Sequence, residues 1–255
     1  MYAEERQQAI ADLITQRGRL SVAELAERFA VTTETVRRDL SLLERAGVVR
    51  RVHGGAVPAA SLTVLELAVG ERDSSHSDEK DRVAAAALKF LPTDGGSVLL
   101  DAGTTTARLA ALLPHEHPFT VYTNAVPIAA RLAARPNVDL HLLPGRVRRT
   151  TQAAVGEETV AALEPLRVDV AFVGTNGLTV EHGLSTPDQS EAAAKQAMVT
   201  CGRQVVVLTD SSKVGHESTI RFAKLDQVDA VVTDSGLAAG DRDALSALDV
   251  DVVLA

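Results

Sequence analysis

Seven short apolar runs in the C-terminal part of the chain constrain its fold more than any other feature. Stretches with helical periodicity separate the runs, and a further one, Asp81–Leu91, precedes them. Strands that alternate with helices are typical of an α/β domain whose mainly parallel sheet is covered on both faces. In such a domain, ligands bind beyond the carboxyl ends of the strands. The runs are Ser97–Leu100, Thr120–Thr123, Val138–Leu143, Val168–Val173, Gln204–Thr209, Ala230–Thr233 and Asp251–Leu254.

A polar turn follows each of the first five runs. In Asp101–Thr106, Gly103 permits a tight turn, and the free backbone amides at the start of the next helix can hold an anion. The sequence favours a phosphate cradle here, and a plain helix cap is the alternative. The turn is not a Walker loop, because no Gly-Lys-Ser/Thr follows, and the chain has no Gly-x-Gly-x-x-Gly motif for a dinucleotide.

The other four turns carry amide, hydroxyl, carboxylate and basic groups, and we expect them to converge with the first on one pocket. Each turn alone is more often ordinary turn chemistry. Glu191 and Lys195 stand four residues apart on an alanine-rich helix, a spacing that ordinarily gives a surface ion pair. The four turns are Thr123–Asn124, Pro144–Arg146 with Arg148 and Arg149 close behind, Gly174–Gly177 and Asp210–Lys213.

Three short helices and a basic hairpin are predicted in the first sixty residues. The spacing of apolar residues predicts a helix over about residues 4–16. Ser21 followed by Glu24 is a capping box that begins a second helix. A third helix is predicted from a Thr32 cap to about Arg45. Basic and apolar residues then lead to a Gly-Gly pair, which is typical of a small hairpin.

The third predicted helix has a buried stripe of Val36, Leu40 and Leu43 and a basic outer face. Such a face behind a tight helix-turn-helix suits a recognition helix in the major groove of DNA, and the hairpin can reach backbone phosphates. The alternative is an ordinary three-helix bundle with solvated arginines. The residues expected to contact DNA are Ser21, Thr32, Thr33, Glu34, Thr35, Arg37, Arg38, Ser41, Arg45, Arg50, Arg51 and His53.

Asp39 has no expected contact with DNA, because phosphates repel a carboxylate. We expect it to orient an arginine or to brace the helices. The distribution of charge agrees modestly with a DNA-binding head: residues 1–60 hold nine arginines against eight carboxylates, whereas the rest of the chain holds 17 basic and 26 acidic residues.

The first sixty residues resemble the helix-turn-helix signature of DeoR-type bacterial repressors. The resemblance implies a C-terminal sensor domain similar in fold to ribose-5-phosphate isomerase, with an acid and a lysine near a bound sugar phosphate. Residues Arg6, Ile10, Ile14, Thr32, Thr35, Val36, Arg37, Arg38, Asp39 and Leu40 carry the signature. The matching stretches of the sensor are Asp101–Thr106, Gly174–Gly177, Gly183–Pro187, Glu191–Lys195 and Asp210–Lys213.

One position departs from the family pattern. Members commonly carry Gly-x-Asp-Gly, whereas this chain has Asn176 in place of the aspartate. An amide forms hydrogen bonds but cannot act as an acid or base, so the change favours sensing over catalysis.

These features predict a small winged helix-turn-helix domain over residues 1–57, a linker over 58–76 and a larger α/β sensor domain over 77–255. The sheet of the sensor is expected to be mainly parallel. The residues expected to bind the effector are Asp101, Gly103, Thr104, Thr105, Thr106, Thr123, Asn124, Gly145, Arg146, Arg149, Thr175, Asn176, Gly177, Glu191, Lys195, Asp210 and Lys213.

The favoured function is a non-enzymatic repressor of a carbohydrate-utilisation operon. It binds double-stranded operator DNA as a homo-oligomer, a dimer or a tetramer, and it responds to a phosphorylated sugar, among which the family favours fructose 1-phosphate. The alternative is an isomerase-like enzyme fused to a DNA-binding module, in which Asp101, Glu191 and Lys195 transfer protons. A scaffold with a vestigial pocket is a third hypothesis.

We expect a cytoplasmic protein with no cofactor, metal or membrane partner. Cys201 is the only cysteine, so no internal disulfide forms, and the chain has neither a signal-like start nor a long apolar stretch. His115 and His117 lack a third ligand at a recognisable spacing, so a solvated loop is expected there.

Overall fold

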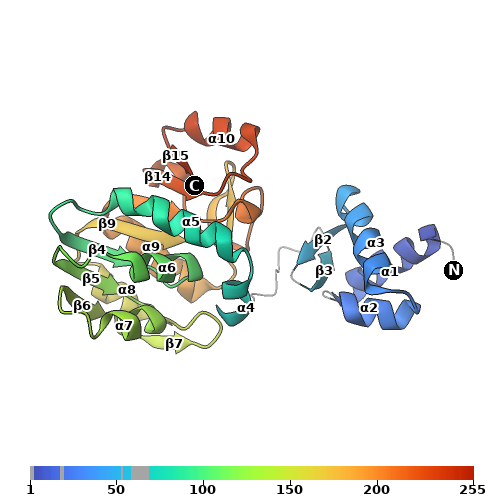
Figure 1. Cartoon of the computed structure of the whole chain (residues 1–255), viewed down its shortest axis with the longest axis horizontal. Helices are drawn as coiled ribbons and strands as arrows, with labels where there is room; N and C mark the ends of the chain where they lie inside the picture. The colour runs from blue at the N-terminus through green and yellow to red at the C-terminus, as the bar shows by residue number, and fades with distance from the viewer. Residues whose placement is uncertain (1–2, 18–19, 53, 59–68) are drawn as a thin grey trace. The chain divides into compact units, whose positions relative to one another are not determined.

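The computed structural model describes residues 3–17, 20–52, 54–58 and 69–255 (Figure 1). The chain divides into two compact units, Met1–Leu65 and Glu66–Ala255. Among the described residues, we find no helix with the length and apolar character that crossing a membrane requires.

The first unit contains three helices and a small antiparallel sheet of order β1-β3-β2. Ser21 and Glu24 form the predicted capping box at the start of α2, and the hydroxyl of Thr32 accepts a hydrogen bond from the amide of Thr35 at the start of α3. β1 was not predicted, because two residues are too few to give a periodic signal. The elements are α1 (Ala3–Arg17), β1 (Leu20–Ser21), α2 (Val22–Phe29), α3 (Thr33–Arg45), β2 (Val49–Val52) and β3 (Gly55–Pro58).

A charged contact joins α1 to α3 beside the apolar core of this unit. The carboxylate of Asp39, which is 2% exposed, accepts hydrogen bonds from Nε of Arg6 at 2.6 Å and from the amide of Gln7 at 2.8 Å. The expectation that Asp39 braces the helices is therefore confirmed. The arginine that it orients is Arg6, which lies 33 residues away in the sequence.

All seven apolar runs of the second unit become strands of one parallel sheet, in the order β15-β14-β12-β9-β4-β5-β6. The predicted fold class is confirmed. β4 and β9 lie side by side near the middle of the sheet, with Leu100 opposite Phe172. The strands are β4 (Gly96–Leu100), β5 (Phe119–Thr123), β6 (Val138–Leu142), β9 (Val168–Gly174), β12 (Gly202–Leu208), β14 (Ala230–Thr233) and β15 (Asp251–Leu254).

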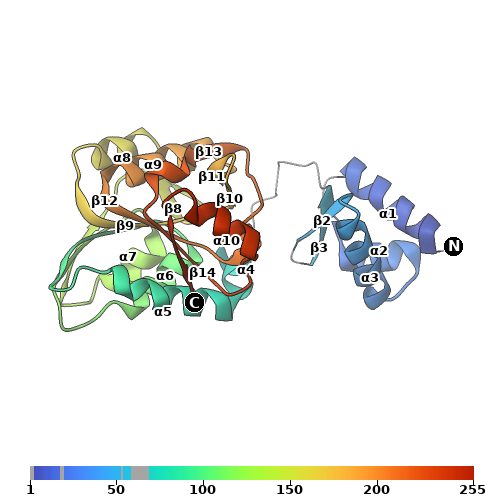
Figure 2. The same ribbon diagram turned by 90° about the horizontal axis from the view of Figure 1, so that it is seen from above.

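Helices cover both faces of this sheet, as Figure 2 shows. One face packs against α5, α6 and α7, and the other packs against α8 and α9, with Leu245 of α10 in the same apolar cluster. These helices are α5 (Ser77–Ala87), α6 (Thr104–Leu112), α7 (Val126–Leu132), α8 (Glu157–Leu163), α9 (Gln189–Cys201) and α10 (Ala239–Ser246).

Several short elements were not predicted. Helix α4 (Val69–Ser74) lies within the stretch predicted to be a linker, and α5 begins at Ser77, earlier than the predicted Asp81. A hairpin of β7 (Arg146–Arg148) and β8 (Ala153–Val155) follows β6. A second small sheet consists of β10 (Gly177–Thr179), β11 (Gly183–Thr186) and β13 (Ile220–Ala223).

Candidate functional site

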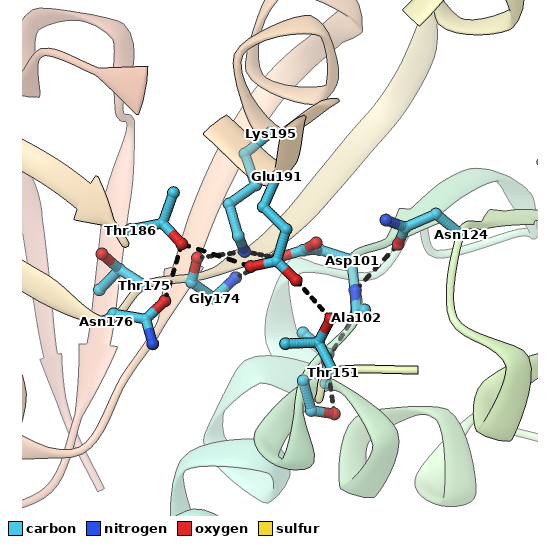
Figure 3. A network of polar contacts seen from close by, with 12 residues as sticks. Asp101, Ala102, Asn124, Thr151, Gly174, Thr175, Asn176, Thr186, Glu191 and Lys195 are labelled. Carbon is cyan, nitrogen blue, oxygen red and sulfur yellow. Dashed lines mark hydrogen bonds and ion pairs between the residues drawn. The ribbon is translucent and has the colours of Figure 1, made fainter. Parts of the chain in front are cut away.

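Two strand ends and one helix meet in a buried charged network beyond the carboxyl ends of β4 and β9 (Figure 3). Asp101 follows β4 and is 1% exposed. Its Oδ2 accepts a hydrogen bond from the amide of Gly174, at the end of β9, at 2.9 Å. The same carboxylate pairs with the ammonium of Lys195, which also donates to the carbonyl of Gly174 at 2.9 Å. The predicted convergence of these strand ends is therefore present.

Glu191 lies one turn before Lys195 on α9 and has separate partners. Its carboxylate accepts a hydrogen bond from the hydroxyl of Thr151 and lies 2.7 Å from Nη1 of Arg148. Its other oxygen lies 3.3 Å from the hydroxyl of Thr186, which contacts the side-chain oxygen of Asn176 at 3.0 Å. Asn176 therefore forms the hydrogen bond that an amide permits at this position.

The alternative that Glu191 and Lys195 form a surface ion pair is wrong. The two residues are 4% and 5% exposed, because the face of α9 that carries them packs against the second unit's own strands and loops. A buried charge is costly unless it is paired, and here each charge has its own opposite partner. The i, i+4 spacing therefore marks a buried face of α9.

The β7–β8 hairpin contributes two site residues, Arg148 and Thr151, that were not among the predicted ones. Arg148 contacts both Glu191 and Asp188, and Asp188 caps the start of α9. The neighbouring residues Arg146 and Arg149, which were predicted to bind the effector, are exposed. The sequence gives no signal that distinguishes Arg148 from them, because a three-residue strand is too short to show alternation.

The Asp101–Thr106 turn has the form expected of an anion cradle. Gly103 precedes α6 in an extended conformation and caps no amide, and the first helical hydrogen bond runs from Ala107 to Gly103 at 3.0 Å. Within the part of the chain that the structure describes, the amides of Thr104 and Thr105 have no acceptor. Free amides at a helix start attract an anion.

Other predicted residues hold the loops in shape. Asn124 accepts a hydrogen bond from the amide of Ala102 at 3.0 Å and donates to the carbonyl of Ala154 at 3.0 Å. The hydroxyls of Thr106, Thr123 and Thr175 donate to backbone carbonyls at 2.7, 2.6 and 2.6 Å. We therefore assign these three threonines to bracing the turns instead of contacting a ligand.

Two predicted glycines are required by close packing. A Cβ atom at Gly145, where φ is +135°, would lie 2.3 Å from the hydroxyl of Thr159. One at Gly177 would lie 2.4 Å from the carbonyl of His216. Both distances are shorter than contact permits, so these glycines allow neighbouring segments to approach.

The fifth predicted turn, Asp210–Lys213, lies near a lysine that was not predicted. Lys80 is 5% exposed and donates hydrogen bonds to the carbonyls of Arg72 and Ser75. Burial lowers the pKa of Lys80 to about 8, although the negative charge of Asp210 acts in the opposite direction. A signal was present in the sequence, because Lys80 shares the stripe of α5 that buries Val83, Ala84 and Ala87.

A cavity of about 350 Å³ adjoins the cradle. Residues of α4, α6 and α7 line it, and Gly103, Thr104 and Thr151 connect it to the groups described above. Its wall is mostly apolar, with two arginines, Arg108 and Arg131. This volume suits a small polar molecule.

In the first unit, α3 presents a basic outer face beside the β2–β3 hairpin. Glu34, Arg37, Arg38 and Arg45 are exposed, as predicted for an outward face. The guanidinium of Arg51 on β2 donates to the hydroxyl of Ser41 on α3 at 3.0 Å. The hairpin is therefore fixed against α3. Of the other residues predicted to contact DNA, Ser21 and Thr32 cap helices, Thr33 is exposed and Thr35 is half-buried. The side chain of Arg50 and the whole of His53 lie outside the described residues.

Metal-binding clusters of three or more His, Cys, Asp or Glu side chains are absent from the described residues. His115 and His117 lie in the loop before β5, as the sequence predicts.

Comparison with known proteins gives matches over both units. Residues 6–61 match the DeoR-like helix-turn-helix domain, and residues 75–235 match the DeoR C terminal sensor domain.

Curated relatives align over nearly the whole chain. The HTH-type transcriptional regulator GlpR of Haloferax volcanii is 36% identical over 253 residues, which is 99% of this chain and 98% of that protein. The uncharacterized HTH-type transcriptional regulator FruR of Bacillus subtilis is 34% identical over 92% of each protein. The glycerol-3-phosphate regulon repressor of Escherichia coli is 29% identical over 91% of this chain and 90% of that protein.

Solved structures similar to the chain include ribose 5-phosphate isomerase A from Neisseria gonorrhoeae. That enzyme is 15% identical, with a TM-score of 0.37 over 55% of this chain and 54% of its own.

Proposed function

Because this chain belongs to the DeoR family of transcriptional regulators, we propose that its first unit binds operator DNA and that a phosphorylated sugar in the second unit sets the affinity. The observation that carries the proposal is the unpaired start of α6 beside the buried network of Asp101, Gly174 and Lys195. In this proposal, the free amides of the cradle bind the phosphate, and the polar groups around the cradle form hydrogen bonds with the hydroxyls of the sugar.

The DNA-binding half of the proposal rests on α3 and the hairpin. Arg37, Arg38 and Arg45 project from α3, and the bond from Arg51 to Ser41 sets the hairpin beside it. A basic helix of this kind reads base edges, and a flanking wing contacts phosphates. A two-fold symmetric operator requires at least a dimer, so we expect a dimer or a tetramer in solution.

Sensing is favoured over catalysis by the environment of Glu191. The residue is 4% exposed, one of its oxygens is held by Thr151 and Arg148, and the other lies 3.3 Å from the hydroxyl of Thr186. A general base needs an oxygen within reach of a substrate proton. Asn176 offers only an amide. If the full chain isomerised pentose or hexose phosphates and Glu191→Ala abolished the turnover, the protein would be an enzyme and this proposal would be wrong.

Fructose 1-phosphate is the first effector to test. Glycerol 3-phosphate is the second, because one relative is named the glycerol-3-phosphate regulon repressor. A bound ligand raises the melting temperature of the protein that binds it. We expect one phosphorylated sugar to raise the melting temperature of the full chain and the unphosphorylated sugar to have no effect. A screen in which no sugar phosphate shifts the temperature would refute the sensor half of the proposal.

The cradle is tested by steric blocking. Thr104→Gln and Thr105→Gln should abolish the effect of the sugar phosphate on DNA binding and leave DNA binding itself intact, because longer side chains fill the space in front of the amides. Thr93→Gln, in an exposed loop after α5, is the matched control. Gel-shift titrations with and without the sugar phosphate measure both properties. A response equal to that of the wild type would remove the cradle from the proposal.

A further inference from the structure

We propose that helix α4 responds to a ligand bound in the cavity beside the Asp101–Thr106 cradle, and that Arg108 is the residue that positions α4 next to this cavity. The inference rests on the proposed function and adds the route by which the crevice acts on DNA binding. Helix α4 is the first described element of the second unit, so it lies where the chain enters that unit from the DNA-binding unit. A change in the position of α4 therefore moves this point of entry.

Arg108 joins α4 to the cradle. It lies one turn after Thr104 on α6, and its guanidinium donates to the carbonyl of Thr104 at 3.1 Å. The same guanidinium pairs with the carboxylate of Asp73 and donates to the carbonyl of Asp73 at 3.0 Å. A further contact with Asp81 of α5, at 2.7 Å, completes the set of charged partners. One side chain thus holds both the first turn of the cradle and the last turn of α4.

Hydrogen bonds attach both ends of α4 to other parts of the second unit. At its start, the amide of Val69 donates to the carbonyl of Thr150 at 3.1 Å, and the next residue, Thr151, contacts Glu191. At its end, Lys80 donates to the carbonyls of Arg72 and Ser75. A helix of six residues is not stable alone in water, so these attachments determine where α4 lies.

Helix α4 also forms one wall of the 350 Å³ cavity beside the cradle. Val69 and Asp73, four residues apart and therefore on one face of the helix, line the cavity together with Thr104. A phosphate held at the start of α6 places negative charge near the guanidinium of Arg108. That charge competes with Asp73 for the guanidinium, because both are anions. Binding of the phosphate therefore weakens the attachment of α4.

The guanidinium of Arg72 is consistent with a second position of α4. Its Nε and Nη2 atoms are buried and have no hydrogen-bond partner among the residues that the structure describes. Buried donors without partners are unfavourable. A different position of α4, in which these two atoms form hydrogen bonds, would therefore be favoured by those bonds.

The test uses the full-length chain, fructose 1-phosphate and inorganic phosphate as probes, and an operator duplex selected from a random pool by the wild type. Asp73→Asn removes the charge on the α4 side of the contact, and Arg108→Ala removes the whole contact. Arg242→Ala is the control, because Arg242 is an exposed arginine on α10 that does not line the cavity. For each protein we measure the affinity for the sugar phosphate and the change in DNA affinity that a saturating concentration causes.

In the wild type, the sugar phosphate should change the affinity for DNA by about 5- to 150-fold, the usual range for coupled sites. Asp73→Asn should bind the sugar phosphate at least as tightly as the wild type, because Asp73 no longer competes for the guanidinium, whereas Arg108→Ala should bind it more weakly. Both variants, compared at saturating sugar phosphate, should show a coupling below about twofold. Arg242→Ala should keep the coupling. Full coupling in both α4 variants would overturn the inference, whereas a wild type that binds no sugar phosphate would overturn the proposed function and this inference with it.

Hydrogen exchange provides a readout that needs no effector. The amides of residues 69–74 should exchange at least about tenfold faster in Asp73→Asn and Arg108→Ala than in Arg242→Ala, because the attachment of α4 is lost. Unchanged exchange in that segment would show that Arg108 does not hold α4. If Arg108→Ala fails to fold, Asp73→Asn decides the question, because it leaves the contact between Arg108 and Asp81 in place.

Discussion

Lys80 illustrates how the position of a single side chain changes its chemistry. Burial lowers its pKa from an ordinary value of 10.5 to about 8, while its ammonium group holds the carbonyls of Arg72 and Ser75. The unfolded chain retains the proton up to about pH 10.5, whereas the folded protein loses it from about pH 8. Between these values the unfolded state binds more protons, so raising the pH stabilises the fold through this residue.

We therefore expect the difference in unfolding free energy between the wild type and Lys80→Met to grow as the pH rises from 8 to 10.5. The growth should be up to about 3 kcal/mol, at about 1.4 kcal/mol for each pH unit. Denaturant titrations at several pH values measure it. Lys89→Met, at an exposed lysine just after α5, is the control for the substitution itself. A flat difference for Lys80→Met would contradict the assigned environment.

Asp39 is the corresponding residue of the first unit. Its removal leaves Arg6, whose side chain is 12% exposed, without its carboxylate partner. We expect Asp39→Ala to lower the unfolding free energy of that unit by about 2 to 4 kcal/mol, because an unpaired buried charge is costly. Glu34→Ala removes an exposed contact with Arg37 and should cost well under about 1 kcal/mol. Hydrogen exchange of α1 and α3 in the two variants distinguishes these outcomes.

At the scale of elements, apolar runs that alternate with helices were predicted correctly, and several isolated short elements were not. Each of the seven apolar runs became a strand of the parallel sheet, because an apolar run that alternates with helices has few other ways to be covered. Helix α4 and the β7–β8 hairpin were missed, since six- and three-residue elements carry no measurable period. Their formation depends on contacts with α6 and α9 that only the folded chain provides.

The candidate site divides in the same way. Asp101 was predicted because it follows a strand, and Glu191 and Lys195 were predicted from the resemblance to the family. Arg148 was named only as a basic residue behind the third turn, and Thr151 was not predicted, because the contacts of both depend on how the hairpin lies against α9. Sequence patterns thus find residues at the ends of regular elements, and they miss residues that loops bring to the site.

The recognition helix carries its own prediction. Arg38→Ala should weaken operator binding by about 1 to 3 kcal/mol and relax the preference for one base, because an outward arginine on α3 is placed to read base edges. Arg51→Ala should weaken binding to all sequences similarly and reduce the salt dependence, because Arg51 belongs to the flanking hairpin. Gel shifts with operator and unrelated duplexes at two salt concentrations compare the two. Equal behaviour of both variants and the wild type would reject α3 as the reading element.

At the scale of the whole molecule, the two units must influence each other equally. If the sugar phosphate weakens DNA binding by a given factor, the operator must weaken sugar-phosphate binding by the same factor, because the coupling free energy belongs to the pair. Calorimetric titration of the sugar phosphate into the free protein and into the protein–operator complex measures one factor, and gel shifts measure the other. Two factors that differ beyond error would mean that additional species, such as a change of oligomeric state, take part.

The arrangement of strands has a consequence for synthesis of the protein. β4 pairs with β9, some seventy residues later in the chain, so the large sheet cannot close until most of the second unit has left the ribosome. The first unit needs only its own local contacts and is complete much earlier. A nascent or prematurely terminated chain would therefore carry a finished helix-turn-helix unit without a complete sensor domain, and limited proteolysis of ribosome-bound chains of increasing length would reveal whether the first unit gains protection first.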